Sequence, residues 1–231
     1  DTSMPARWYG LKISGEALAG AALLFLLPGT RIASNGFSGH MSGVACLTLL
    51  LAPLAFFLPA GHAVASTGPG DVARTLPPGL RAMLWLGLLG VTVFMFSATM
   101  SWAFGERVAA DAGYDPVATG QVLAVPLLFA VAGSLTAVVL GARYGTARPL
   151  VGACIALLAA LALLVLSETL ATYGAAACLL TWAIAVGLTY SITVVANLDL
   201  DGRYVVLTVP ALGLGIMTAP VAGGLIAAYG G

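Results

Sequence analysis

Charge is scarce in this chain. Only 8% of its 231 residues are Asp, Glu, Lys or Arg, where a soluble protein typically has about 25%. Nine basic residues balance nine acidic ones, so the formal net charge is zero. The chain has no basic patch that interleaves with aromatic residues, so we expect no nucleic-acid binding. The 60% of hydrophobic residues instead favours a membrane protein.

Motifs for catalysis and cofactor binding are also missing. Neither His40 nor His62 belongs to an HExxH pattern or a ligand cluster. The chain has no GxSxG elbow and no GxxxxGK[ST] phosphate loop, so we expect no enzyme, metal, cofactor or ATP-driven pump. Lys12 is the only lysine, so the last span has no Schiff-base lysine and a retinal protein is excluded. The cysteines stand alone in apolar stretches, which predicts small buried hydrophobic residues: Cys46, Cys154 and Cys178.

Long apolar runs are what the chain has in abundance. A helix needs about 20 residues to cross a hydrocarbon core of roughly 30 Å. Six of the seven runs reach this length without a charged residue in their interior. The sequence therefore predicts an all-α membrane protein with seven transmembrane helices, at residues 8–28, 41–60, 82–104, 118–141, 148–167, 171–196 and 204–229.

The basic residues alternate between the two sides of these spans. Only Arg31 and Arg107 fall on one side. Because short cytoplasmic loops carry the excess of Lys and Arg, we expect a multi-pass protein of the cell inner (plasma) membrane with a cytoplasmic N-terminus. No signal-peptide pattern follows Asp1, so no cleaved targeting segment is predicted. The other side carries Arg7, Lys12, Arg74, Arg81, Arg143, Arg148 and Arg203.

The longest polar connection divides the chain into unequal parts. Residues 61–81 read GHAVASTGPGDVARTLPPGLR, which is typical of a flexible cytoplasmic linker. Two spans within residues 1–60 precede it, and five spans within 82–231 follow with short loops that predict one compact bundle. Small residues recur every four positions in the last span, which favours close helix packing. Proline within spans, as at Pro126, Pro210 and Pro220, permits kinks.

Several polar and aromatic residues lie within the spans and are candidates for a binding site. A bundle interior that presents hydroxyls, an amide and aromatic rings suits a small molecule of moderate polarity. The alternative is structural, since Ser and Thr in membrane helices often bond their own backbone or neighbouring helices. Glu16 would lie about 12 Å into the membrane if its helix begins near Trp8, or in water if that helix enters at a shallow angle. The binding candidates are Phe94, Ser97, Ser101, Gln121, Trp182 and Tyr190.

Two segments resemble motifs of the major facilitator superfamily. The loop GARYGTARP is similar to that family's G-x-x-x-D-R-x-G-R-R, with Arg143 and Gly145 at the central positions and Ala142 in place of the Asp. The last span reads GIMTAPVAGG, which is similar to G-x-x-x-G-P-x-x-G-G. The matching residues there are Gly215, Pro220, Gly223 and Gly224.

The resemblance implies a secondary active transporter that moves a small organic solute or drug by alternating access between two bundles. It places the chain at the fifth to eleventh helices of a twelve-helix protein, with 61–81 joining the two halves. A truncated fragment is then expected, whose central cavity the binding candidates line. Glu16 would couple transport to protons across that cavity. The alternative is a non-transporting membrane protein, such as a receptor or an assembly subunit.

Overall fold

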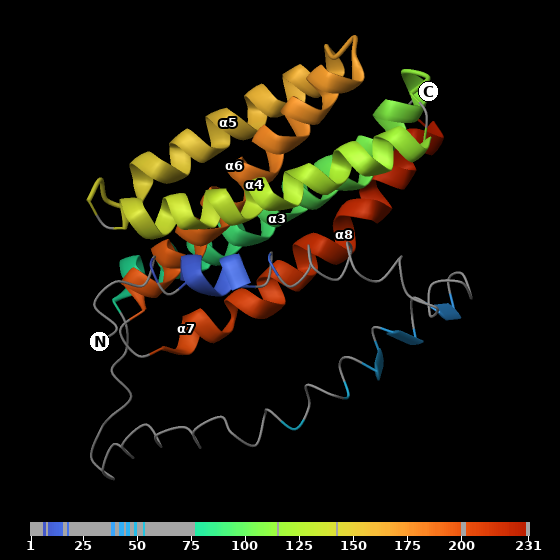
Figure 1. The fold of residues 1–231 in the computed structure, drawn as a ribbon. Coiled ribbons are helices and arrows are strands. Elements are labelled where there is room, and N and C mark those ends of the chain that lie inside the picture. Colours follow the sequence, from blue (N-terminus) through green and yellow to red (C-terminus); the bar gives the residue numbers. More distant parts are fainter. Residues whose placement is uncertain are drawn as a thin grey trace. The chain divides into compact units, whose positions relative to one another are not determined.

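The computed structural model describes residues 77–229 except for Asp115, Ala142, Leu200 and Asp201. In the N-terminal part it describes residues 7, 9–15 and 18, and single positions between 38 and 53. Every regular element in these residues is helical. Figure 1 shows long helices that run along one another. They are α3 (Pro78–Asp111), α4 (Pro116–Leu140), α5 (Ala147–Val165), α6 (Leu170–Leu198), the short α7 (Arg203–Val206) and α8 (Thr208–Tyr229).

These helices correspond to the five spans predicted for the C-terminal bundle. Four segments are long and apolar enough to cross a membrane, which indicates a membrane protein: Pro78–Ala109, Ala147–Val165, Leu170–Leu198 and Arg203–Ile226. α4 covers the remaining predicted span with 25 residues. The prediction of seven spans stays a prediction, because residues 8–28 and 41–60 lie largely outside the described part.

Three boundaries differ from the sequence prediction by more than two residues. α3 begins at Pro78 instead of residue 82, so it includes the last four residues of the predicted linker 61–81. α3 continues to Asp111, so the expected loop after residue 104 is reduced to residues 112–115. The last predicted span is interrupted at Leu207, between α7 and α8. Pro210 explains this break, since it has no N–H for the Val206 carbonyl and its ring crowds that carbonyl.

α6 is the central helix of the bundle. It contacts α3, α4 and α5, and 72% of its most apolar 18-residue stretch is buried, compared with 22% for α5. Alanine and glycine fill much of the buried surface of α6. Small side chains let the backbones of neighbouring helices approach, which matters in lipid because no hydrophobic force drives helix to helix.

Glycines mark the closest contacts between helices. A Cβ added at Gly133 of α4 would lie 2.5 Å from the Trp182 carbonyl oxygen of α6. A Cβ at Gly215 of α8 would lie 2.6 Å from the Thr92 carbonyl oxygen of α3. In both places backbone faces backbone, so only glycine fits without moving a helix.

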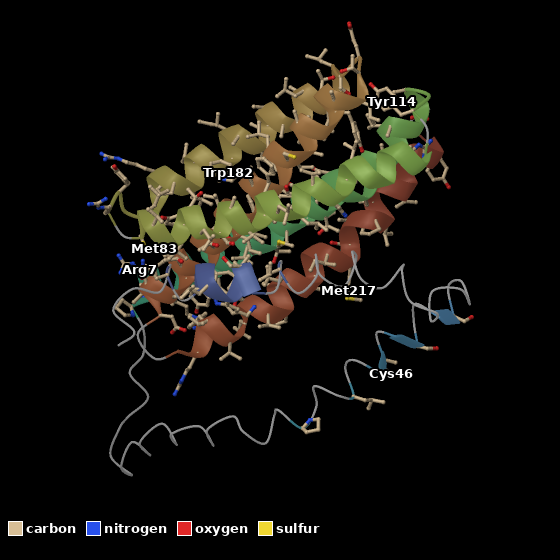
Figure 2. All side chains as sticks on the ribbon, viewed as in Figure 1. Arg7, Cys46, Met83, Tyr114, Trp182 and Met217 are labelled. Atoms are coloured by element: carbon tan, nitrogen blue, oxygen red, sulfur yellow. The ribbon has the colours of Figure 1, made fainter. Side chains whose placement is uncertain are left out.

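The two ends of the bundle carry different charges. At one end, Trp85 near the start of α3 packs edge-on against Tyr204 of α7, with ring centroids 5.9 Å apart. At the other end, the Tyr114 hydroxyl donates to the Ser167 carbonyl at 3.2 Å. Arg7 and Tyr114 accordingly lie towards opposite ends in Figure 2. Of the described arginines, Arg107 lies at the Tyr114 end, and the Trp85 end carries Arg7, Arg81, Arg143, Arg148 and Arg203.

An N-terminal helical segment packs onto this bundle. A Cβ at Gly10 would lie 2.6 Å from Val138 Cγ2 of α4, and the hydroxyls of Ser14 and Ser134 are 2.6 Å apart. By its contacts, residues 1–21 group with 78–231, and residues 22–77 form a separate unit. The predicted division into 1–60, a linker at 61–81, and 82–231 stays a prediction, since most of residues 19–76 lie outside the described part.

Candidate functional site

Two sizeable cavities border α3, on different sides of the helix. The α3–α4 cavity is an open pocket with a volume of about 270 Å³, lined by α3, α4, α6 and Ile13 of the N-terminal segment. The α3–α5 cavity is also open, measures about 480 Å³ and is lined by α3, α5 and α6. Residues 97 and 99 differ by about 200° around the helix, which explains why Ser97 and Thr99 line different cavities.

Phe94 and Ser97 are the predicted binding residues that the structure brings together. Both line the α3–α5 cavity, alongside Cys154 of α5 and Ser191 of α6. The ring of Phe94 occupies the space that a side chain at Gly187 would need. Several of the residues that line this cavity, such as Leu86 and Leu158, are exposed apolar residues of membrane-spanning helices. It therefore faces the surroundings of the bundle.

Ser101 lies one turn further along α3, but its hydroxyl has a structural partner. It donates to the Ser97 carbonyl at 2.7 Å, the backbone bond that Ser commonly makes in membrane helices. Ser101 also lines a small cavity of about 20 Å³ with Trp102 and Tyr173. That volume holds little more than one water molecule, so Ser101 has no room for a solute beside it.

Trp182 and Tyr190 line neither of the two sizeable cavities and instead fasten α6 to α4. The Trp182 indole donates to Thr136 Oγ1 at 3.3 Å, in the middle of the bundle (Figure 2). The fully buried Tyr190 hydroxyl donates to the Gly141 carbonyl at 2.9 Å, where α4 ends. Their predicted common face on α6 exists, but the structure turns it towards α4.

Gln121 and Glu16 remain candidates from sequence alone. Gln121 belongs to α4, but its side chain is outside the described part, as is Glu16 as a whole. The roles predicted for them in solute binding and proton coupling therefore stay predictions.

The residues of the two motifs lie in the α4–α5 turn and in α8. Arg143 is exposed, and Gly145 has a φ of 70°, a backbone conformation that favours glycine. Gly215 makes the close contact between α8 and α3. The other three motif residues lie further along α8, where Gly223 is buried and Pro220 and Gly224 are exposed.

Most hydroxyls of the bundle are used for structural hydrogen bonds. Among the Ser and Thr residues of α3–α8 with described side chains, only Ser97 and Thr99 make no hydrogen bond with the described residues. Thr99 was not among the predicted site residues. The bonded hydroxyls belong to Thr92, Ser101, Ser134, Thr136, Thr172, Thr181, Thr189, Ser191, Thr193, Thr208 and Thr218.

The walls of the α3–α4 cavity contain no charged residue. Apart from Thr99 and Thr181 they consist of apolar residues, with Trp102 as the aromatic one. The Thr181 hydroxyl is occupied, because it donates to the Pro126 carbonyl at 2.7 Å. Among the described residues, no group of three His, Cys, Asp or Glu side chains could hold a metal ion. The cavity is suited to binding an uncharged molecule.

No protein-family model, curated protein or solved structure matches this chain.

Proposed function

We propose that this chain is part of a secondary active transporter that moves a small organic solute across the inner membrane by alternating access. The observation that carries the proposal is the α3–α4 cavity, which lies between the C-terminal bundle and the N-terminal segment of Ile13. A mostly apolar cavity with few polar groups is typical of small-molecule sites. The resemblance of the α4–α5 turn and of α8 to motifs of the major facilitator superfamily supports the same function.

We propose that the N-terminal segment, which supplies Ile13 to the cavity wall, moves against the bundle during transport. It contacts α4 through Gly10, Ser14 and their partners Ser134 and Val138, but it is joined to the bundle in sequence only through residues 22–77. Transport by alternating access requires that one part of the protein rock against another around a fixed site. A separately connected wall meets that requirement.

Orientation is the second part of the proposal. Five described arginines lie at the Trp85 end of the bundle and one at the opposite end. We infer from this excess of basic residues that the first end, and with it the N-terminus, faces the cytoplasm.

Solute counterflow in proteoliposomes tests the proposal. The chain is expressed within its complete reading frame and reconstituted into vesicles. The vesicles are preloaded with one unlabelled solute, chosen from a panel of neutral aromatic compounds. We expect a transient accumulation of the labelled solute inside the vesicles, absent from protein-free vesicles. If no solute of the panel exchanges, while the protein remains folded by circular dichroism, the protein is the non-transporting alternative.

Proton coupling is tested separately with Glu16→Gln. We expect this variant to fold, to exchange solute, and to lose the pH dependence of transport, because Gln cannot release a proton at any pH used. An unchanged pH profile in Glu16→Gln would remove Glu16 from the coupling mechanism. It would leave the transport proposal itself intact.

A further inference from the structure

The Thr99 hydroxyl is unusual because it lies on a cavity wall without a structural role. The other Ser and Thr hydroxyls with described side chains in α3–α8 donate to a carbonyl, whereas Thr99 and Ser97 bond to none of the described residues. Thr99 lines the α3–α4 cavity, and Ser97 lines the α3–α5 cavity. Since no buried side-chain polar atom of the described residues lacks a partner, the Thr99 hydroxyl is accessible from the cavity. A ligand there can supply the hydrogen-bond partner that the protein does not.

The remaining wall defines what else the ligand must be. No charged side chain lines the cavity, so an ionic ligand would lose its hydration without gaining a counter-charge. Trp102 and the aliphatic residues around it offer contact area for an apolar or aromatic body. The volume of about 270 Å³ limits that body to a small molecule.

We propose that the α3–α4 cavity selects uncharged, largely apolar molecules with one hydrogen-bonding group, and that Thr99 is the residue that recognises this group. The inference rests on the proposed function only where it takes the ligand of the cavity as the transported solute. The apolar walls bind the body of the ligand. Thr99 determines specificity, because it distinguishes ligands of equal size by whether they carry a hydrogen-bonding group.

Three probes of similar size separate these contributions: tritiated 1-naphthol, 1-methylnaphthalene and 1-naphthalenesulfonate. Binding to the purified chain in lipid nanodiscs is measured by equilibrium dialysis, with empty nanodiscs subtracted. We expect wild type to bind 1-naphthol most tightly and the sulfonate most weakly. In Thr99→Val, we expect 1-naphthol affinity to fall about three- to tenfold, the range of one neutral hydrogen bond, with 1-methylnaphthalene affinity unchanged.

Two matched variants serve as controls. Thr99→Ser keeps the hydroxyl and should keep the preference for 1-naphthol. Ser97→Ala removes the other unpaired hydroxyl, on the α3–α5 cavity, and should change nothing. Unchanged binding of 1-methylnaphthalene also shows that Thr99→Val leaves the cavity folded.

Several results would overturn the inference. One is an unchanged 1-naphthol affinity in Thr99→Val, and another is loss of the preference for 1-naphthol over 1-methylnaphthalene in Ser97→Ala or Trp102→Phe instead. The others are binding of the sulfonate as tight as that of 1-naphthol, and no binding of any probe above empty nanodiscs. Failure of the proposed function looks different. In that case the Thr99-dependent preference is present in nanodiscs, but 1-naphthol shows no counterflow in proteoliposomes.

Discussion

Single glycines set the distances between helices in this bundle. At Gly133 an added Cβ would meet the Trp182 carbonyl oxygen at 2.5 Å and the Ala185 Cβ at 3.1 Å. The nearest atom is backbone, so no side-chain rotation can relieve the clash and α4 must move away from α6. Only the structure shows that Gly133 faces α6.

We predict that Gly133→Ala lowers the free energy of unfolding by about 1–3 kcal/mol, the usual cost of overpacking. Thermal unfolding in detergent, followed by circular dichroism, measures the change. Gly152→Ala in α5 is the matched control, since nothing lies within 4 Å of its added Cβ. That variant should be neutral or slightly more stable, because alanine favours the helix. Equal stability of the two variants would contradict the close contact.

Tyr190 illustrates how a plausible binding residue can be structural. Its side chain is fully buried, and its hydroxyl donates to the Gly141 carbonyl at the end of α4. We predict that Tyr190→Phe lowers the free energy of unfolding by about 1–3 kcal/mol, because the Gly141 carbonyl is left without its partner. Ligand affinity, measured with 1-naphthol in nanodiscs, should stay the same.

Tyr144→Phe provides the comparison for this prediction. Tyr144 lies in the α4–α5 turn and is 55% exposed, so water replaces any partner of its hydroxyl. Its loss should leave the melting temperature unchanged. A fall in 1-naphthol affinity in Tyr190→Phe, without a loss of stability, would instead return Tyr190 to the binding site.

At the scale of elements, the connection from α6 to α8 depends on Asp199. One carboxylate oxygen, Oδ2, accepts the backbone N–H groups of Tyr204 and Val205, both at 2.7 Å. Those groups belong to the first turn of α7, where helical N–H groups have no partner within the helix. Asp199 therefore caps α7 from a position just after the end of α6, and it holds the two elements together.

We predict that Asp199→Ala destabilises the start of α7 by about 1 kcal/mol. Amide hydrogen exchange at Tyr204 and Val205 should then become roughly fivefold faster. Asp111→Ala is the control, because it also removes a carboxylate but at the end of α3, where a negative charge opposes the helix dipole and caps nothing in α7. It should not slow or speed exchange in α7. Unchanged exchange in Asp199→Ala would show that the cap contributes nothing.

The apolar composition of the spans predicted the helices, but it did not predict which helix lies at the centre of the bundle and which at its edge. α5 and α6 are similarly apolar along their whole length, yet α6 is the buried centre and α5 lies at the edge. In lipid, a hydrophobic face does not identify the interior, because the surrounding tails are as apolar as leucine. The content of Gly and Ala does not separate the two helices either, since it is 9 of 29 residues in α6 and 7 of 19 in α5.

At the scale of the whole molecule, the distribution of arginines predicts which end faces the cytoplasm. In a variant without Cys46, Cys154 and Cys178, single cysteines at Ala112 and Thr146 should react with a membrane-impermeant maleimide from opposite sides. Ala112 follows α3 at the Tyr114 end, and Thr146 precedes α5 at the Trp85 end. Whole cells should label Ala112→Cys, and inverted vesicles Thr146→Cys. Labelling of both from one side would contradict the predicted topology.

The sequence by itself determined the helices, their approximate bounds and the sorting of charge, because crossing a membrane fixes length, composition and loop charge locally. It did not determine which polar residues face a cavity. That depends on how each helix is rotated against its neighbours, and close contacts such as Gly133 with Trp182 and Gly215 with Thr92 decide the rotation.

The tertiary structure therefore divided the predicted binding residues into separate groups. Phe94 and Ser97 line the α3–α5 cavity, whereas Trp182 and Tyr190 fasten α6 to α4. It also selected Thr99, which lines the α3–α4 cavity and, unlike Thr92 on the same helix face, has no hydrogen-bond partner among the described residues. Hydrogen bonding to a carbonyl one turn away depends on the side-chain rotamer, and the sequence does not specify this for any single Ser or Thr.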